Sequence, residues 1–132
     1  MRLAPARVVA RVVELWEKWS PVAVVLDPAG PAGSLIPDLE QAGVTVVTVS
    51  VRELGQACGG LFDAVAEGRF RHLGDSVLDS AVAAARRRQI GDLWAWDRKR
   101  SDADISPLVA VTLARWALVS TIAEVPKPVF AY

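Results

Sequence analysis

The sequence predicts an α/β fold in which a small parallel sheet is flanked by helices. Two apolar runs rich in valine, residues 22–27 and 44–49, have the length and β-branched composition of strands, and the first is expected to be buried on both faces. A short helical segment lies between them, opened by Ser34 as a candidate N-cap. A strand, helix, strand order of this size favours parallel pairing through a right-handed crossover.

Helical spacing of apolar residues accounts for most of the remaining chain. The first segment carries Glu14 and Lys18 as a candidate i,i+4 pair, and Ser50 and Glu53 form a capping box ahead of the third. Residues 93–98 alternate and predict an edge strand or a hairpin arm. Helices are expected over residues 5–19, 34–42, 50–68, 75–89 and 105–122.

The composition suits one domain over residues 1–132, since 132 residues with 52% hydrophobic side chains are enough to build a core. Lys+Arg and Asp+Glu are equal at 15 each, so nucleic-acid contacts would rest on local clusters, and the low net charge favours self-association. Cys58 is the one cysteine, which excludes a disulfide framework and a thiolate zinc site. No signal-peptide h-region or membrane-spanning run is present, so we expect a soluble, cytoplasmic protein.

Separated carboxylates are the candidate chemical groups. Asp27 ends the first predicted strand, where open α/β folds place their ligands, and Asp102 and Asp104 precede the last helix. Carboxylates gathered at a sheet edge suit Mg²⁺ or Mn²⁺, and two such ions roughly 4 Å apart hold the attacking and leaving oxygens of a phosphodiester. The plainer alternatives are that Asp27 opens an Asp-Pro turn and that Asp104 is an N-cap.

Several catalytic motifs are absent from the sequence. It contains no G-x-x-x-x-G-K-[ST], no H-E-x-x-H and no G-x-S-x-G. An autonomous nucleotide motor, a zincin and an α/β-hydrolase therefore lack their key residues.

Two basic clusters are candidates for contacts with a DNA backbone, because Arg and Lys supply most phosphate contacts. Their alternative role is a solvated charge run at a helix end. We interpret Trp94 and Trp96, which lie between the clusters, as packing residues rather than base-stacking residues. The six basic residues are Arg86, Arg87, Arg88, Arg98, Lys99 and Arg100.

Three stretches carry a resemblance to a known family: VVLDPAGPAGSLIPDLEQAGVTVVTVS, RFRHLGDSVLDSAVAAARRR and LWAWDRKRSDADISPLVAVTLARWAL. Together they resemble the carboxyl-terminal part of the nuclease domain of tailed-phage terminase large subunits, which has the RNase H-like fold. The resemblance runs from about residue 16 to residue 118, and DISPLVAVTLA is its most specific piece.

The resemblance implies a two-metal endonuclease, using Mg²⁺ or Mn²⁺, that cuts concatemeric double-stranded DNA during packaging. It implies a phage or prophage gene acting in the host cytoplasm, with other terminase segments or a portal as partners. Asp27 matches the acidic residue that ends the fourth strand, Asp104 matches the one that opens the final helix, and Asp102 is a neighbour. His72 matches a histidine before the penultimate helix, although a lone histidine is commonly structural.

The chain departs from the family at its amino-terminal side. The family's first catalytic Asp lies on the first strand of a three-strand meander, and nothing before Arg7 supplies it. We therefore expect a partial RNase H-like fold without that meander and without the motor domain. Two functions stay open: an endonuclease completed by another polypeptide, and a catalytically silent module that binds protein or DNA. Without its neighbouring strand the 22–27 strand becomes an edge, which predicts a homo-oligomer or a strand-borrowing complex.

Overall fold

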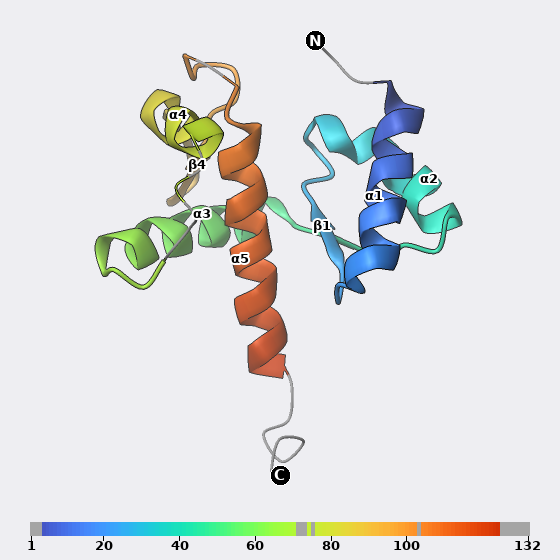
Figure 1. Ribbon diagram of the computed structural model, residues 1–132. Coiled ribbons are helices and arrows are strands. Elements are labelled where there is room, and N and C mark those ends of the chain that lie inside the picture. The colour runs from blue at the N-terminus through green and yellow to red at the C-terminus, as the bar shows by residue number, and fades with distance from the viewer. Residues whose placement is uncertain (1–3, 71–73, 75, 103, 125–132) are drawn as a thin grey trace. The chain divides into compact units, whose positions relative to one another are not determined.

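The computed structural model describes residues 4–70, 74, 76–102 and 104–124, the last four of these by their backbone alone. Its contacts group into two compact units, Met1–Ser50 and Val51–Tyr132 (Figure 1). The expectation of one domain over residues 1–132 stays a prediction. His72, which matches a histidine of the resembled family, and Asp75, the first residue of the helix expected over residues 75–89, lie outside the described residues.

The first unit begins with helix α1, Pro5–Trp19, whose bounds are those predicted from the apolar spacing. Pro5 occupies the first turn, where a missing N–H costs nothing. The helix ends at Ser20, whose φ of 46° is left-handed and whose N–H donates to the carbonyl of Trp16. Glu14, expected to pair with Lys18, forms its ion pair with Arg11 at 2.7 Å.

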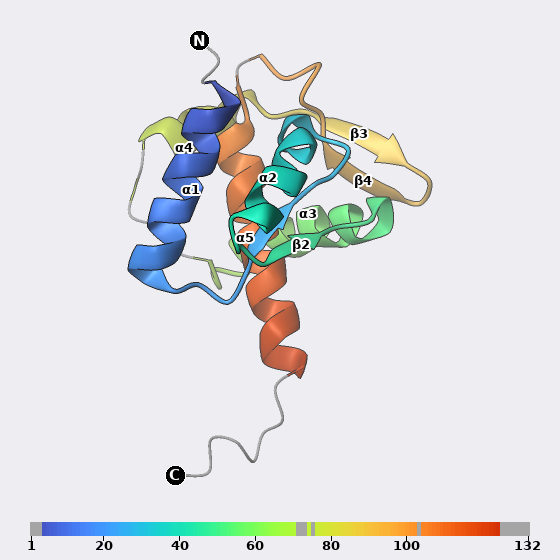
Figure 2. The same cartoon turned by 90° about the vertical axis from the view of Figure 1, so that its right-hand side faces the viewer.

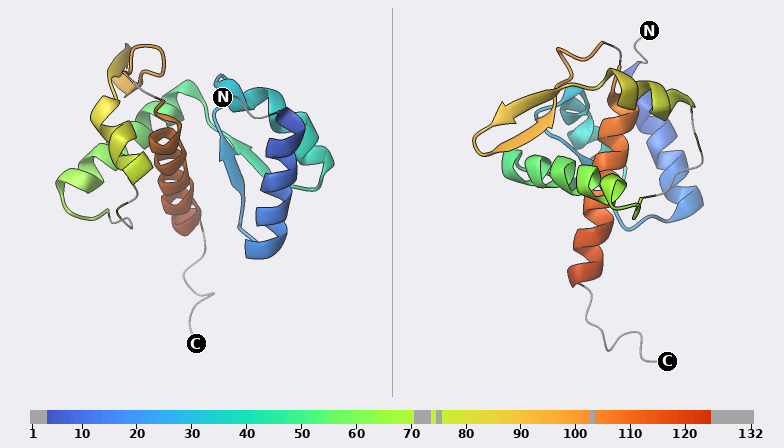
Figure 3. Two further views of the ribbon diagram at one scale, coloured as in Figure 1. Left: turned by 45° about the horizontal axis from the view of Figure 1, so that its top comes forward. Right: turned by 90° about the vertical axis from the view of Figure 1, so that its left-hand side faces the viewer.

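Strands β1, Val24–Leu26, and β2, Val46–Thr48, form a parallel pair, as predicted. Both strands are shorter than the apolar runs, and β1 is half-buried rather than covered on both faces. The reason is that β1 has one partner strand among the described residues and that α1 and helix α2, Ile36–Gln41, lie on the same side of it (Figure 3).

The connection between the two strands differs from the prediction at its start. Ser34 was expected to cap a helix over residues 34–42, but it lies inside the 3₁₀ helix η1, Pro31–Leu35. The α-helix begins at Ile36 with Pro37 in its first turn, where proline fits best. The backbone approaches closely here and requires Gly33, because a Cβ at this position would clash with the carbonyl oxygen of Pro28.

The second unit contains three helices and a hairpin among its described residues. Helices α3, Val51–Ala66, and α5, Ser106–Glu124, lie close to their predicted ranges. Helix α4, Ser76–Ala84, is shorter than the predicted 75–89 segment, because Arg87–Ile90 forms strand β3 instead. This strand pairs antiparallel with β4, Leu93–Trp96, which confirms the predicted hairpin arm.

Helix α5 supports the packing of this unit. Helix α3 crosses α5 (Figures 1 and 3), and the β3–β4 hairpin lies alongside α3 (Figure 2). The close approach of the hairpin to α3 depends on Gly55, where a Cβ would lie 2.8 Å from the Cβ of Leu93. The core cluster of the second unit consists of Leu61, Leu78, Ala81 and Leu108.

These elements make an α/β fold with a small parallel sheet and flanking helices, as the sequence predicted. Over the ranges that the structure describes, none of the helices has both the length and the apolar character needed to span a membrane.

Candidate functional site

Asp27 directly follows β1 and closes a tight turn. Its Oδ1 accepts a hydrogen bond from the N–H of Ala29 at 3.0 Å, and its carbonyl accepts one from the N–H of Gly30 at 3.0 Å. This is the Asp-Pro turn that the sequence offered as the plainer role. Oδ2 receives no hydrogen bond from any residue within the described ranges, so one carboxylate oxygen remains available to a ligand.

Asp104 opens α5 in the manner of a cap. Its Oδ1 accepts hydrogen bonds from the N–H of Ser106 at 2.9 Å and from the Ser106 hydroxyl at 2.6 Å. The two bonds from Ser106, hydroxyl first, lower the pKa of Asp104 below its ordinary value of 3.8, and the charge of Arg98 adds to the effect. The carboxylate is exposed and charged at neutral pH, which is the state that a divalent cation requires.

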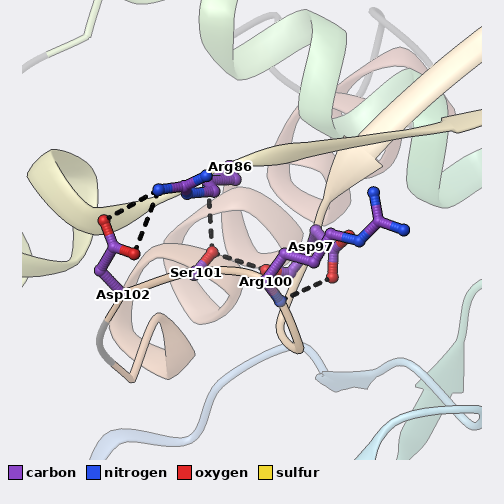
Figure 4. Close-up of polar contacts among 5 residues, drawn as sticks. All are labelled: Arg86, Asp97, Arg100, Ser101 and Asp102. Carbon is purple, nitrogen blue, oxygen red and sulfur yellow. Dashed lines mark hydrogen bonds and ion pairs between the residues drawn. The ribbon is translucent and has the colours of Figure 1, made fainter.

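Asp102 forms an ion pair with a basic side chain. One guanidinium nitrogen of Arg86 lies 3.3 Å from Oδ1 and 3.4 Å from Oδ2 of this carboxylate (Figure 4). Both side chains are exposed, so the pair contributes at most about 1 kcal/mol to stability. A metal ion at Asp102 would have to compete with Arg86.

Asp97 is a buried carboxylate, 6% exposed, that the sequence analysis did not single out. Its Oδ1 accepts hydrogen bonds from the N–H groups of Lys99 and Arg100 at 3.0 and 3.1 Å. The hydroxyl of Ser101 donates to the Asp97 carbonyl and accepts from the N–H of Arg86 (Figure 4). An Asp at a strand end followed by a polar run is typical of such a turn, and that signal was available.

Asp97 thus fixes the loop on which Asp102 lies. The N–H of Asp102 donates to the carbonyl of Ala84, at the end of α4, at 3.2 Å. The loop is therefore held at both ends by the backbone of neighbouring elements.

The predicted meeting of Asp27 and Asp104 stays a prediction. Asp27 belongs to the first unit and Asp104 to the second, and each is placed within its own unit. Within the described ranges no group of three or more His, Cys, Asp or Glu side chains gathers to hold a metal ion. What the structure supplies is two carboxylates, each anchored through one oxygen by a neighbouring N–H.

The predicted basic residues have different surroundings. Arg86 pairs with Asp102, Arg98 donates to the Ser106 hydroxyl at 3.1 Å, and Arg100 lies 3.8 Å from Asp97. A further basic side chain, that of Arg87, lies over aromatic rings. Within the described part of the chain, the side chains of Arg88 and Lys99 have no such contact and are the two freest to meet a phosphate.

Trp94 and Trp96 pack as the sequence analysis expected. Their rings meet edge to face with centroids 4.8 Å apart, and Trp94 meets Phe62 of α3 in the same way at 5.9 Å. Both tryptophans are half-buried, so their faces are largely occupied by protein.

Comparison with known proteins extends this description. No protein-family model matches the sequence, and no curated protein sequence matches it. The crystal structure of the HK97 bacteriophage large terminase is similar over 87% of this chain, with a TM-score of 0.72 and 20% sequence identity. The match covers 25% of the terminase, so the chain spans about a quarter of that protein's length. The chain therefore shares its fold with part of a phage large terminase, which confirms the resemblance noted in the sequence.

Proposed function

We propose that this chain is a terminase-type nuclease-domain fragment that contributes two carboxylates, Asp27 and Asp104, to a metal-dependent endonuclease for double-stranded DNA. The observation that carries the proposal is the fold shared with the HK97 large terminase over 87% of the chain. Asp27 ends a parallel strand and Asp104 opens the last helix, the positions that the family resemblance assigns to acidic residues. The setting that follows is phage DNA packaging in the host cell, with other terminase segments or a portal as partners.

The residues present fit Mg²⁺ or Mn²⁺. Both ions prefer oxygen ligands, and the Oδ2 atoms of Asp27 and Asp104 accept no hydrogen bond from described residues. When bound, such ions would supply an activated hydroxide and stabilise charge on the phosphoryl oxygens. The two aspartates would hold the cation, while Ala29 and Ser106 orient their carboxylates by hydrogen bonds to Oδ1. Asp102 would join the ligands only if released from Arg86.

Two carboxylates leave a two-metal site undersupplied, so a further acidic group must come from another segment or polypeptide. The isolated chain is therefore expected to bind the metal weakly and to cut DNA slowly or not at all. Arg88 and Lys99 are proposed as the first contacts with the DNA backbone, and the other four basic residues as supports of the surface around them.

The edge of β1 that has no partner strand among the described residues also suggests how completion would occur. Val24 and Leu26 direct their backbone groups towards β2, through bonds from Val24 to Thr45 and from Val49 to Leu26. The backbone N–H and C=O of Val25 then point to the edge of β1 opposite β2, where the described residues of the first unit provide no partner strand. We propose that this edge pairs with a second copy of the chain or with a strand of another terminase polypeptide.

A second candidate function is a silent assembly module that binds protein or DNA without cutting. The favouring observation is that each candidate carboxylate already has a local role. Asp27 closes a turn, Asp104 caps a helix, and Asp102 pairs with Arg86.

Calorimetric titration with Mn²⁺ separates these functions. The first predicts measurable binding that is lost in both Asp27→Asn and Asp104→Asn, with the double variant no weaker than either single one because both aspartates hold the same site. Asp63→Asn, which removes an exposed charge from α3, is the matched control. Mn²⁺ binding absent from the wild-type chain, or unaffected by either aspartate substitution, would reject the nuclease proposal in favour of the silent module. Plasmid cleavage measured in parallel reports whether the bound metal is active.

A further inference from the structure

An apolar groove of about 550 Å³ lies within the second unit. Its floor is formed by core residues that include Leu61 and Leu108, and by Trp96 of the hairpin. Helices α3 and α4 form its walls, and both pack on α5 beneath. The groove is thus a feature of one compact unit.

The walls expose apolar side chains that the unit itself does not cover. Phe62 and Val65 of α3 are 46% and 58% exposed, and Val82 of α4 is 55% exposed. Apolar side chains gathered along a groove, above a buried core, are typical of a surface that binds a partner.

A positive charge is fixed at the rim of the groove. The guanidinium of Arg87 lies 4.3 Å from the ring centre of Phe62 and 4.1 Å from that of Trp94. These cation–π contacts hold the charge in place, and no carboxylate among the described residues pairs with it. Arg86 also lines the groove but is paired with Asp102. The rim beside β3 therefore complements a carboxylate.

We propose that this groove binds an amphipathic helix of another protein, with its apolar stripe between α3 and α4 and an acidic side chain on Arg87. Two helical walls with exposed apolar side chains suit the apolar face of a helix, which is a recurring mode of peptide recognition. A nucleic acid would bring phosphates rather than apolar surface to this lining. The inference does not depend on the proposed nuclease function.

A synthetic probe tests the proposal in metal-free buffer. The probe is a labelled 16-residue peptide with leucines at i, i+3, i+4 and i+7 spacing and glutamates on its polar face. Its binding is followed by fluorescence anisotropy and compared with that of the same peptide carrying lysines. The glutamate peptide should bind about fivefold more tightly, as expected for a complementary charge at an exposed rim. Arg87→Gln should remove most of that difference.

Two valines on α4 provide a matched pair. Val82 lines the groove, whereas Val77, 62% exposed, does not. Val82→Asp and Val65→Asp place a charge on opposite walls, and each should weaken binding of the glutamate peptide about tenfold or more. Val77→Asp should leave that binding unchanged. Circular dichroism confirms that each variant is folded. Equal binding of the two peptides, equal effects of Val82→Asp and Val77→Asp, or displacement of the peptide by a short DNA duplex would overturn the proposal.

Discussion

The indole N–H of Trp96 donates a hydrogen bond to Oγ1 of Thr112 across 3.0 Å. Thr112 is fully buried, at 0% exposed, and its hydroxyl donates in turn to the carbonyl of Leu108 at 2.7 Å. This pair joins β4 to α5. It therefore ties the hairpin that carries Arg87 and Arg88 to the helix that Asp104 opens.

Replacing Thr112 by valine should destabilise the second unit by about 1–3 kcal/mol, because valine keeps the shape of threonine but leaves the Trp96 N–H without its partner. Urea unfolding followed by tryptophan fluorescence measures the loss. Thr112→Ser keeps the hydroxyl and is the control, with a smaller loss from the missing methyl group. A Thr112→Val protein as stable as wild type would show that this bond does not support the unit.

Gly55 and Gly59, both on α3, give a contrasting pair. Alanine at 55 would place a Cβ 2.8 Å from Leu93, so Gly55→Ala should cost about 1–3 kcal/mol through overpacking. Alanine at 59 meets nothing within 4 Å, so Gly59→Ala should raise stability by up to about 1 kcal/mol through helix propensity. Thermal unfolding of both variants checks the prediction, and effects of the same sign at the two positions would contradict it.

The lowered pKa of Asp104 predicts an effect of acid on stability. Since the folded pKa lies below the unfolded one, Asp104 stabilises the fold fully above about pH 4, and this contribution is lost as the pH falls through the folded pKa. Ser106→Ala removes the hydroxyl hydrogen bond, which is the largest cause of the lowered pKa, and should move the pKa of Asp104 back towards 3.8. A carboxyl-carbon NMR titration of both proteins measures the shift. Identical midpoints in the two proteins would show that Ser106 does not set this pKa.

The sequence predicted the parts of the fold that depend on local pattern. The valine runs, the proline at the start of α1 and the apolar stripe of α3 each identify an element without reference to distant residues. The helix over residues 75–89 was extended too far because the alanines before Arg86 continue a helical pattern. Strand β3 forms instead through pairing with Trp94 and Trp96, which is not visible in its own sequence.

The candidate site was predictable only in part, for a similar reason. Placing Asp27 after a strand and Asp104 before a helix needed only the flanking residues, and both placements are confirmed. The partner of Asp102 is Arg86, whose approach depends on the hairpin and on the turn that Asp97 closes. Likewise the contact of Arg87 with two aromatic rings depends on α3 and β4 meeting in space.

Strand β1 has no partner on the edge opposite β2 among the described residues, and this edge predicts self-association. We expect light scattering at micromolar concentration to show a dimer or a higher assembly. Val25→Pro should yield a monomer that keeps the β1–β2 pair, because proline removes an N–H that points away from β2. Val24→Pro is the contrasting variant, since it removes the bond to Thr45 and should destabilise the first unit. A wild-type chain that stays monomeric, with the Val25 amide protected from exchange by a strand of its own chain, would contradict this prediction.

The proposed endonuclease requires Asp27 and Asp104 to hold the same divalent cation, and two amides report on this requirement directly. The N–H of Ala29 is bonded to the carboxylate of Asp27, and the N–H of Ser106 to that of Asp104. In an NMR titration with substoichiometric Mn²⁺, which broadens the signals of nuclei near the ion, both amide signals should broaden together. In the Asp27→Asn variant, neither the Ala29 signal nor the Ser106 signal should broaden. Broadening of one amide alone, or broadening at Ser106 that survives Asp27→Asn, would contradict the shared site.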